Sequence, residues 1–202
     1  MERTIEVMAK EEHSATLWTT PNVLSFFRVA AIPFVVGFLF FPDPLSSFLA
    51  ALFFFVASLT DLLDGYIARQ QKSETAVGKL LDPMADKLLI NSALIMLISL
   101  DRIPAWMVVL IVGREVAVTG LRGIATTQGL VIAASIWGKA KLVLQSMALI
   151  GLMLHYKYLG IDFHFLGMLL LWIALAITLW SGIDYFHRFY REHRKTGKRL
   201  KV

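Results

Sequence analysis

Four aspartates lie close together in the stretch DLLDGYIARQQKSETAVGKLLDPMADK, which covers residues 61–87 of the 202-residue chain. They are Asp61, Asp64, Asp82 and Asp86, and long apolar runs flank them on both sides. A carboxylate at the centre of a membrane-spanning helix costs roughly 2.5–3.5 kcal/mol on insertion scales. Neighbouring carboxylates also repel one another and tend to take up protons. Four carboxylates at this place therefore need a chemical explanation.

The spacing of the aspartates places them on narrow faces of two predicted helices. At about 100° of rotation per residue, a stripe about 140° wide on the first helix holds Asp61, Asp64, Gly65, Ala68 and Arg69. On the next helix, a stripe about 80° wide holds Gly78, Asp82 and Asp86. If the two helices pack as neighbours, two aspartates from each helix can point into one space. Pro83 lacks a backbone donor and is expected to kink the second helix there.

A hard divalent cation accounts for this arrangement, because Mg²⁺ and Mn²⁺ prefer oxygen ligands and offset the repulsion between carboxylates. The small residues on the same stripes let a ligand approach the backbone closely, and Arg69 adds a guanidinium that binds anions. Any single aspartate could instead serve a proton relay or pair with a basic residue on a neighbouring helix. Four aspartates on matched stripes favour the metal site.

The composition is that of a membrane protein. The chain is 57% hydrophobic and 17% charged, with a mean hydropathy of +0.65, whereas soluble domains have about 45–50% apolar and about 25% charged residues. It has no cysteine, which excludes disulfides, thiolate nucleophiles and Cys-ligated zinc. The net charge is +5, and the basic residues crowd the C-terminus beside an apolar stretch. We therefore expect them to meet a bilayer with anionic lipids and not nucleic acid.

Six apolar stretches are long enough to cross a bilayer, which needs roughly 20 residues; they lie at about 21–41, 46–70, 80–100, 104–127, 137–156 and 163–186. The predicted fold class is an all-α integral membrane protein, a bundle of six transmembrane helices. Residues 1–20 have no apolar core of a cleavable signal and predict a short amphipathic interfacial helix. Residues 21–187 then form the catalytic domain, and residues 188–202 form a basic cytoplasmic tail.

The basic residues orient the predicted bundle. Of the 20 lysines and arginines, only Arg102 and Lys157 fall on the side of the turns that begin at residues 42, 101 and 156. Basic residues collect on the cytoplasmic side of membrane proteins. We therefore expect both termini and the aspartate segment to lie toward the cytoplasm.

The aspartate spacing resembles, without a single departure, the signature of the CDP-alcohol phosphotransferases; it reads Asp61-x2-Asp64-Gly65-x2-Ala68-Arg69-x8-Gly78-x3-Asp82-x3-Asp86. Eight fixed positions make this a specific match. That family has a six-helix membrane fold and is usually a homodimer, in agreement with the six apolar stretches. The resemblance implies two Mg²⁺ (or Mn²⁺) ions and a CDP-alcohol substrate that is reached from the cytoplasm.

The resemblance also implies roles for the signature residues. Asp61, Asp64 and Asp82 are the implied metal ligands, and Asp86 is implied to be both near the metals and the general base. The cytidine and pyrophosphate are expected to lie against Gly65, Ala68, Arg69 and Gly78.

Basic residues further along the chain suit a small phosphorylated acceptor. Arg114 and Arg122 are eight residues apart, about 80° around a helix, and therefore share a face. Arg114 lies too deep in its span to reach the interface by snorkelling. Lys139 and Lys141 diverge by about 200°, so one of them is expected in the site. Lys139 is favoured, and Lys141 is assigned either to the acceptor phosphate or to the interface.

Three stretches, TPNVLSFFRVAAIPF, GREVAVTGLRGIATTQG and SIWGKAKLVLQ, resemble the branch of the family that uses glycerol 3-phosphate. The implied reaction moves the phosphatidyl group of CDP-diacylglycerol to sn-glycerol 3-phosphate, giving phosphatidylglycerol phosphate and CMP, in the bacterial inner membrane. Arg28 falls in the first stretch and is assigned to the acceptor phosphate, because an arginine within a span is functional by default. Asn22 is assigned to CDP-diacylglycerol, although beside Pro21 it also suits a helix cap.

Two kinds of alternative remain. Another acceptor is compatible with the signature: inositol phosphate, a second phosphatidylglycerol, or serine. A divalent-cation transporter belongs to a different class, but all four aspartates cluster toward one membrane face and no matching polar group marks the opposite half. His155 and His164 lie on that opposite side, so we do not expect them to hold the metal. Glu115 points about 100° away from Arg114 and is expected to orient a neighbouring arginine or lysine.

Overall fold

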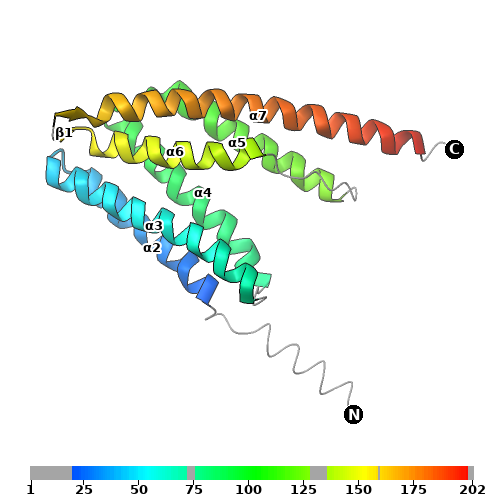
Figure 1. The fold of residues 1–202 in the computed structure, drawn as a ribbon, viewed down its shortest axis with the longest axis horizontal. Coiled ribbons are helices and arrows are strands. Elements are labelled where there is room, and N and C mark those ends of the chain that lie inside the picture. The colour runs from blue at the N-terminus through cyan, green and yellow to red at the C-terminus, as the bar shows by residue number, and fades with distance from the viewer. Residues whose placement is uncertain (1–19, 72–75, 128–135, 159, 200–202) are drawn as a thin grey trace, which may run out of the picture. The chain divides into compact units, whose positions relative to one another are not determined.

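In the structure, a computed structural model, the described residues form long helices and one short β-hairpin (Figure 1). It describes the backbone of residues 20–71, 76–127, 136–158 and 160–199, and the side chains of residues 26–60, 84–127, 140–158 and 160–194. The interfacial helix predicted over residues 1–20 lies outside the described residues, apart from Thr20.

The described residues form α2 (Thr20–Leu39), α3 (Pro44–Gln71), α4 (Ala76–Ser99), α5 (Ala105–Thr127), α6 (Ile136–Leu154) and α7 (Phe163–Arg199). Between α6 and α7, β1 (Lys157–Tyr158) pairs antiparallel with β2 (Ile161–Asp162). The all-α prediction is confirmed, and each apolar stretch coincides with a helix. The last stretch is only the apolar part of its helix, because α7 continues beyond residue 186 as far as Arg199.

One described helix is long and apolar enough by itself to cross a membrane, by length and composition: residues Phe163–Arg194 of α7. Shorter apolar segments lie in α2, α3 and α6, at Phe26–Leu39, Pro44–Thr60 and Ala140–Leu154. Large apolar side chains such as Phe165 and Trp180 are exposed on α7. In a lipid bilayer this exposure carries no penalty, since the surroundings are as apolar as the side chains.

The chain divides into two compact units, residues 1–96 and residues 97–202, which we call the N-terminal and C-terminal units. In the N-terminal unit, α2 packs against α3. The ring of Phe53 on α3 stacks on Phe34 and on Phe38 of α2, with 5.5 Å between ring centres in both pairs. Val35 on α2 and Phe54 on α3 are fully buried as well.

The start of α3 is fixed by Asp43, which lies between two prolines. Its Oδ1 accepts a hydrogen bond from the backbone N–H of Ser46 at 2.9 Å, and its backbone carbonyl accepts the N–H of Ser47 at 3.0 Å. Aspartate is a favoured N-cap residue, and Pro44 at the first helical position already has the φ angle that a helix needs. The sequence Pro-Asp-Pro thus both ends one turn and begins the helix that carries two of the aspartates.

In the C-terminal unit, α6 packs along α7, and α5 also contacts α7 (Figure 1). The contact between α6 and α7 depends on two glycines. A Cβ atom added to Gly167 would lie 2.6 Å from the backbone nitrogen of Leu152 and 2.8 Å from the carbonyl carbon of Gly151. Helices in membranes approach this closely only where small residues meet.

Arg102 closes the C-terminal end of α6. Its Nη1 donates to the carbonyl oxygens of Met153 at 2.7 Å and Leu152 at 3.4 Å, and the side chain is buried. The last carbonyls of a helix have no partner within the helix and carry partial negative charge. His155 then leaves the helix at φ 54°. Arg102, one of the two basic residues predicted on the side opposite the cytoplasm, therefore stabilises the end of a helix.

The hairpin between α6 and α7 joins them without a long loop. Asp162 begins α7, because its Oδ1 accepts the backbone N–H of Phe165 at 3.0 Å, and this hydrogen bond lowers the pKa of the Asp162 carboxyl. The Nδ1 atoms of His155 and His164 lie 3.2 Å apart.

The glycine contact yields a stability prediction. Gly167→Ala should lower the midpoint temperature of thermal unfolding in detergent. The new methyl group would meet backbone atoms, which cannot move aside as a side chain can by changing rotamer, and overpacking costs about 1–3 kcal/mol. Gly37→Ala is the matched control, since a Cβ there meets none of the described atoms within 4 Å. Thermal unfolding followed by tryptophan fluorescence compares the two. Equal midpoints for both variants would show that α6 and α7 do not depend on this contact.

Candidate active site

The aspartate signature lies on two consecutive helices of the N-terminal unit. Asp61 and Asp64 belong to α3, and Asp82 and Asp86 belong to α4. The prediction that both segments are helical is thus confirmed. Gly65, Ala68 and Arg69 share α3 with the first pair, and Gly78 precedes the second pair on α4.

The aspartates lie at matching distances from the linked ends of the two helices. Asp61 is ten residues before the end of α3, and Asp86 is ten residues after the start of α4. At a rise of 1.5 Å per residue, each is about 15 Å from its helix end, and Asp64 and Asp82 are each about 9–11 Å from theirs. The two helix ends are five residues apart, so they are separated by at most about 18 Å. This register suits carboxylates from both helices acting together.

Among the signature residues, Asp86 is the one whose side chain falls in the described part of the chain, and it is half-buried. Ala85 and Leu89 beside it on α4 are buried. The side chains of the other signature residues lie outside the described residues, as do those of Asn22 and Lys139. Four carboxylates are the donor set that a hard divalent cation prefers, so the residues present fit such an ion.

Arg28 lies on α2 and is 1% exposed. Among the described residues it is one of the largest fully buried side chains. An arginine at such a position in an apolar helix is consistent with the prediction that it has a function there.

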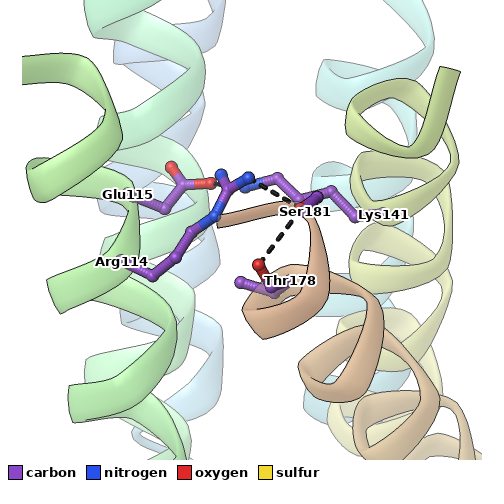
Figure 2. A network of polar contacts seen from close by, with 5 residues as sticks. All are labelled: Arg114, Glu115, Lys141, Thr178 and Ser181. Carbon is purple, nitrogen blue, oxygen red and sulfur yellow. Dashed lines mark hydrogen bonds and ion pairs between the residues drawn. The ribbon is translucent and has the colours of Figure 1, made fainter. Parts of the chain in front are cut away.

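The other predicted basic residues belong to the C-terminal unit, where three helices form a cluster of polar side chains (Figure 2). This polar cluster consists of Arg114 and Glu115 on α5, Lys141 on α6, and Thr178 and Ser181 on α7. Arg114 Nη2 donates to Ser181 Oγ at 2.7 Å. Ser181 Oγ in turn donates to the backbone carbonyl of Thr178 at 3.1 Å.

Lys141 forms an ion pair with Glu115 within the polar cluster. Lys141 is 4% exposed, so its ammonium group lies among the packed helices and not on the surface of the protein. A buried lysine without a counter-charge would be costly, and the carboxylate of Glu115 offsets that cost. The prediction that Glu115 orients a neighbouring basic residue is confirmed, with Lys141 as that residue.

Arg122 lies on the same side of α5 as Arg114, because both contact α7. The guanidinium carbon of Arg122 lies 6.0 Å from the ring centre of Tyr185, at the outer limit of a cation–π contact. Tyr185 is 7% exposed. The shared face predicted from the eight-residue spacing is therefore directed at α7.

Several polar atoms around the cluster are buried without a hydrogen-bond partner in the described part of the chain: Arg114 Nε, Gln145 Oε1, Thr178 Oγ1 and Tyr185 OH. They come from α5, α6 and α7. An unsatisfied buried polar group costs about 1–3 kcal/mol, and most such groups in native proteins bind something. All four atoms thus belong to the three helices that carry the polar cluster.

Sequence reasoning did not single out the residues on α7. Thr178, Ser181, Gly182 and Tyr185 follow the spacing i, i+3, i+4, i+7, which defines one face of a helix. In the sequence they stand within TLWSGIDY, at the end of an otherwise apolar stretch. That polar stripe was the available signal, and it was hidden because each residue alone is unremarkable in a transmembrane helix.

Comparison with known proteins shows the family of this chain. The chain belongs to the CDP-alcohol phosphatidyltransferase family, whose sequence model matches residues 18–180. It is therefore a member of a membrane-bound enzyme family that generally depends on divalent metals.

Several individual members of this family are similar to the chain along most of its length. The chain is 39% identical to the CDP-diacylglycerol–glycerol-3-phosphate 3-phosphatidyltransferase of Bacillus subtilis (strain 168), over 85% of this chain and 95% of the relative. Proteins of the same name are 41% identical in Rickettsia bellii, over 82% of this chain and 92% of the relative, and 39% identical in Haemophilus influenzae, over 82% and 90%.

Proposed function

We propose that this protein transfers the phosphatidyl group of CDP-diacylglycerol to sn-glycerol 3-phosphate and releases CMP and phosphatidylglycerol phosphate. The observation that carries the proposal is the complete eight-position signature on α3 and α4, in a chain that aligns along most of its length with relatives of that name. The buried basic residues of the C-terminal unit support a phosphorylated acceptor.

The four aspartates are assigned to the binding and activation of the phosphatidyl donor, CDP-diacylglycerol. Asp61, Asp64 and Asp82 would hold two Mg²⁺ or Mn²⁺ ions, with Asp86 beside them. When bound, the ions supply Lewis-acid stabilisation of the pyrophosphate charge. Gly65, Ala68 and Gly78 leave room for the cytidine and pyrophosphate to approach the helix backbones, Arg69 contributes a fork of donors to the phosphates, and Asn22 contributes hydrogen bonds to the same nucleotide.

The proton transfer is assigned to Asp86. Its carboxylate takes the proton from the free hydroxyl of the acceptor, and the resulting oxygen attacks the phosphorus that carries diacylglycerol. The bond from that phosphorus to the bridging oxygen breaks, and CMP leaves with the electron pair. The half-buried position of Asp86 suits this role, since a base must meet substrate and still be shielded from bulk water.

The acceptor phosphate is assigned to the basic residues Arg28, Arg114, Arg122, Lys139 and Lys141. Arg114 and Arg122 are the stronger anchors, because their described contacts are with a neutral hydroxyl and a neutral ring, which leave their charges available to a phosphate dianion. Lys141 already has Glu115 as its counter-ion and adds less net charge.

The membrane arrangement follows from the helix lengths and the distribution of basic residues. The helices α2 to α7 are 19 to 37 residues long, and 20 residues span about 30 Å, the thickness of the hydrocarbon core. We therefore propose six membrane spans with both termini and the aspartates on the cytoplasmic side of a bacterial inner membrane, in a homodimer as the family resemblance implies.

The function is tested by CMP release in detergent from CDP-diacylglycerol with a panel of acceptors: glycerol 3-phosphate, inositol phosphate, phosphatidylglycerol and serine. Release should require glycerol 3-phosphate and Mg²⁺. It should be abolished in Asp61→Asn, Asp64→Asn and Asp82→Asn, because a neutral amide binds Mg²⁺ poorly, while the variants keep the wild-type elution volume. Release with another acceptor alone would replace the proposed substrate, and a wild-type rate at limiting Mg²⁺ in any variant would remove that residue from the ligands.

Asp86 should behave differently from the other three aspartates. As a base, it should be dispensable for binding, so Asp86→Asn should keep most of the affinity for Mn²⁺ and CDP-diacylglycerol in calorimetric titration. Single-turnover rates should fall by about 10²–10⁴, the usual contribution of a positioned base. Affinity that falls in step with the rate would instead make Asp86 chiefly a ligand.

Arg114 and Arg122 should determine the affinity for the acceptor. Arg114→Ala and Arg122→Ala should raise the KM for glycerol 3-phosphate roughly ten- to a hundredfold, since a hydrogen bond to a charged group contributes about 1.5–3 kcal/mol. The KM for CDP-diacylglycerol should change little. Steady-state kinetics with each substrate varied in turn measures both constants, and an unchanged acceptor KM in both variants would take these arginines out of the site.

A further inference from the structure

The side chain of Arg114 lies against residues 181 and 182 of α7 (Figure 2). Its Nη2 reaches Ser181 Oγ at 2.7 Å. Its Cγ and Nε lie 3.0 Å and 3.2 Å from the position that a Cβ atom on Gly182 would take. Two neighbouring residues of α7 therefore contact this arginine. Ser181 accepts its hydrogen bond, and Gly182 leaves room for it by having no side chain.

The hydroxyl of Ser181 is oriented to act as an acceptor toward Arg114. It is 3% exposed, and its own proton is donated to the carbonyl oxygen of Thr178. A serine hydroxyl has one donor and two lone pairs. A guanidinium has donors and no acceptor, so Arg114 donates to a lone pair of Ser181 while the serine proton stays on the Thr178 carbonyl.

This contact fixes the position of Arg114 without neutralising it. Lys141 in the same cluster is held by a carboxylate, whereas Arg114 is held by a neutral hydroxyl. Its Nε is buried beside Gly182 and has no hydrogen-bond partner among the described residues. An arginine that is already ordered loses less conformational entropy when it binds an anion.

From these contacts we propose that Ser181 and Gly182 are positioning residues, which together form a seat on α7 that holds the Arg114 guanidinium ready for the phosphate of the acceptor. The proposal rests on the proposed function, because it takes Arg114 as a ligand of that phosphate. The seat determines affinity for the acceptor, and neither residue needs to touch the substrate.

Two variants disturb the seat in different ways. Ser181→Ala removes the acceptor of the Arg114 hydrogen bond with little change in volume. Gly182→Ala keeps that acceptor but adds a methyl group, so that Arg114 must move by a few tenths of an ångström. Gly120→Ala on α5 is the matched control, because a Cβ there meets no described atom within 4 Å.

The expected result is a change confined to the acceptor. Ser181→Ala should raise the KM for glycerol 3-phosphate about tenfold, equivalent to roughly 1.4 kcal/mol, and Gly182→Ala should raise it in the same direction. The KM for CDP-diacylglycerol and kcat at saturating acceptor should stay near wild type, as should both constants in Gly120→Ala. Ser181→Thr, which keeps the hydroxyl, should recover most of the affinity. A general loss of structure would lower kcat and would not separate the two substrates.

A double-mutant cycle tests whether Ser181 acts through Arg114. In an Arg114→Ala background, Ser181→Ala should have no further effect on the acceptor KM, because residues that act as a unit are not additive. Additive effects, or an unchanged acceptor KM in Ser181→Ala, would overturn the seat. Failure of the proposed function is recognised separately, since wild-type enzyme would then show no turnover with glycerol 3-phosphate in the acceptor panel.

Discussion

Every charged group within the apolar helices of this protein requires a partner, since an unpaired charge there is costly. Three basic residues of the C-terminal unit meet this requirement in three ways. Arg102 donates to the last carbonyls of α6, Lys141 pairs with Glu115, and Arg114 donates to Ser181. The first two charges are offset by partial or full negative charge. Arg114 is the one of these three whose described hydrogen-bond partner is a neutral side chain, and this distinguishes it from Arg102 and Lys141.

The helix contacts make that difference possible. Gly151 and Gly167 let α6 and α7 approach until their backbones touch, and α5 contacts α7 as well. As a result α7 lies against both helices that carry basic residues of the polar cluster. Its own stripe of Thr178, Ser181, Gly182 and Tyr185 lies toward Arg114 and Arg122, and Ser181 and Tyr185 are the neutral side chains that these arginines contact.

The sequence was informative wherever the signal was local and periodic. Each apolar stretch became a helix with nearly the expected bounds, because a helix in a bilayer must satisfy its own backbone hydrogen bonds over the full apolar length. The end of α7 was less predictable. A helix satisfies its own backbone hydrogen bonds outside the apolar region as well, so α7 continues through the basic residues that follow. Glu115 was expected to orient a basic neighbour, but its partner, Lys141, is 26 residues away and could not be identified from helical spacing.

The sequence by itself determined the class of chemistry, because the identity and spacing of the aspartates depend only on helix periodicity within α3 and α4. It also determined that Arg114 and Arg122 share a face, for the same reason. Only the tertiary structure decided what that face meets. Lys141 is buried and paired with Glu115 because α6 packs among the other helices of its unit. Arg114 is hydrogen-bonded to Ser181 because α7 contacts α5 at the level of Arg114. Such contacts join residues up to 67 positions apart, and they depend on how the helices pack, which no pattern within a single helix records.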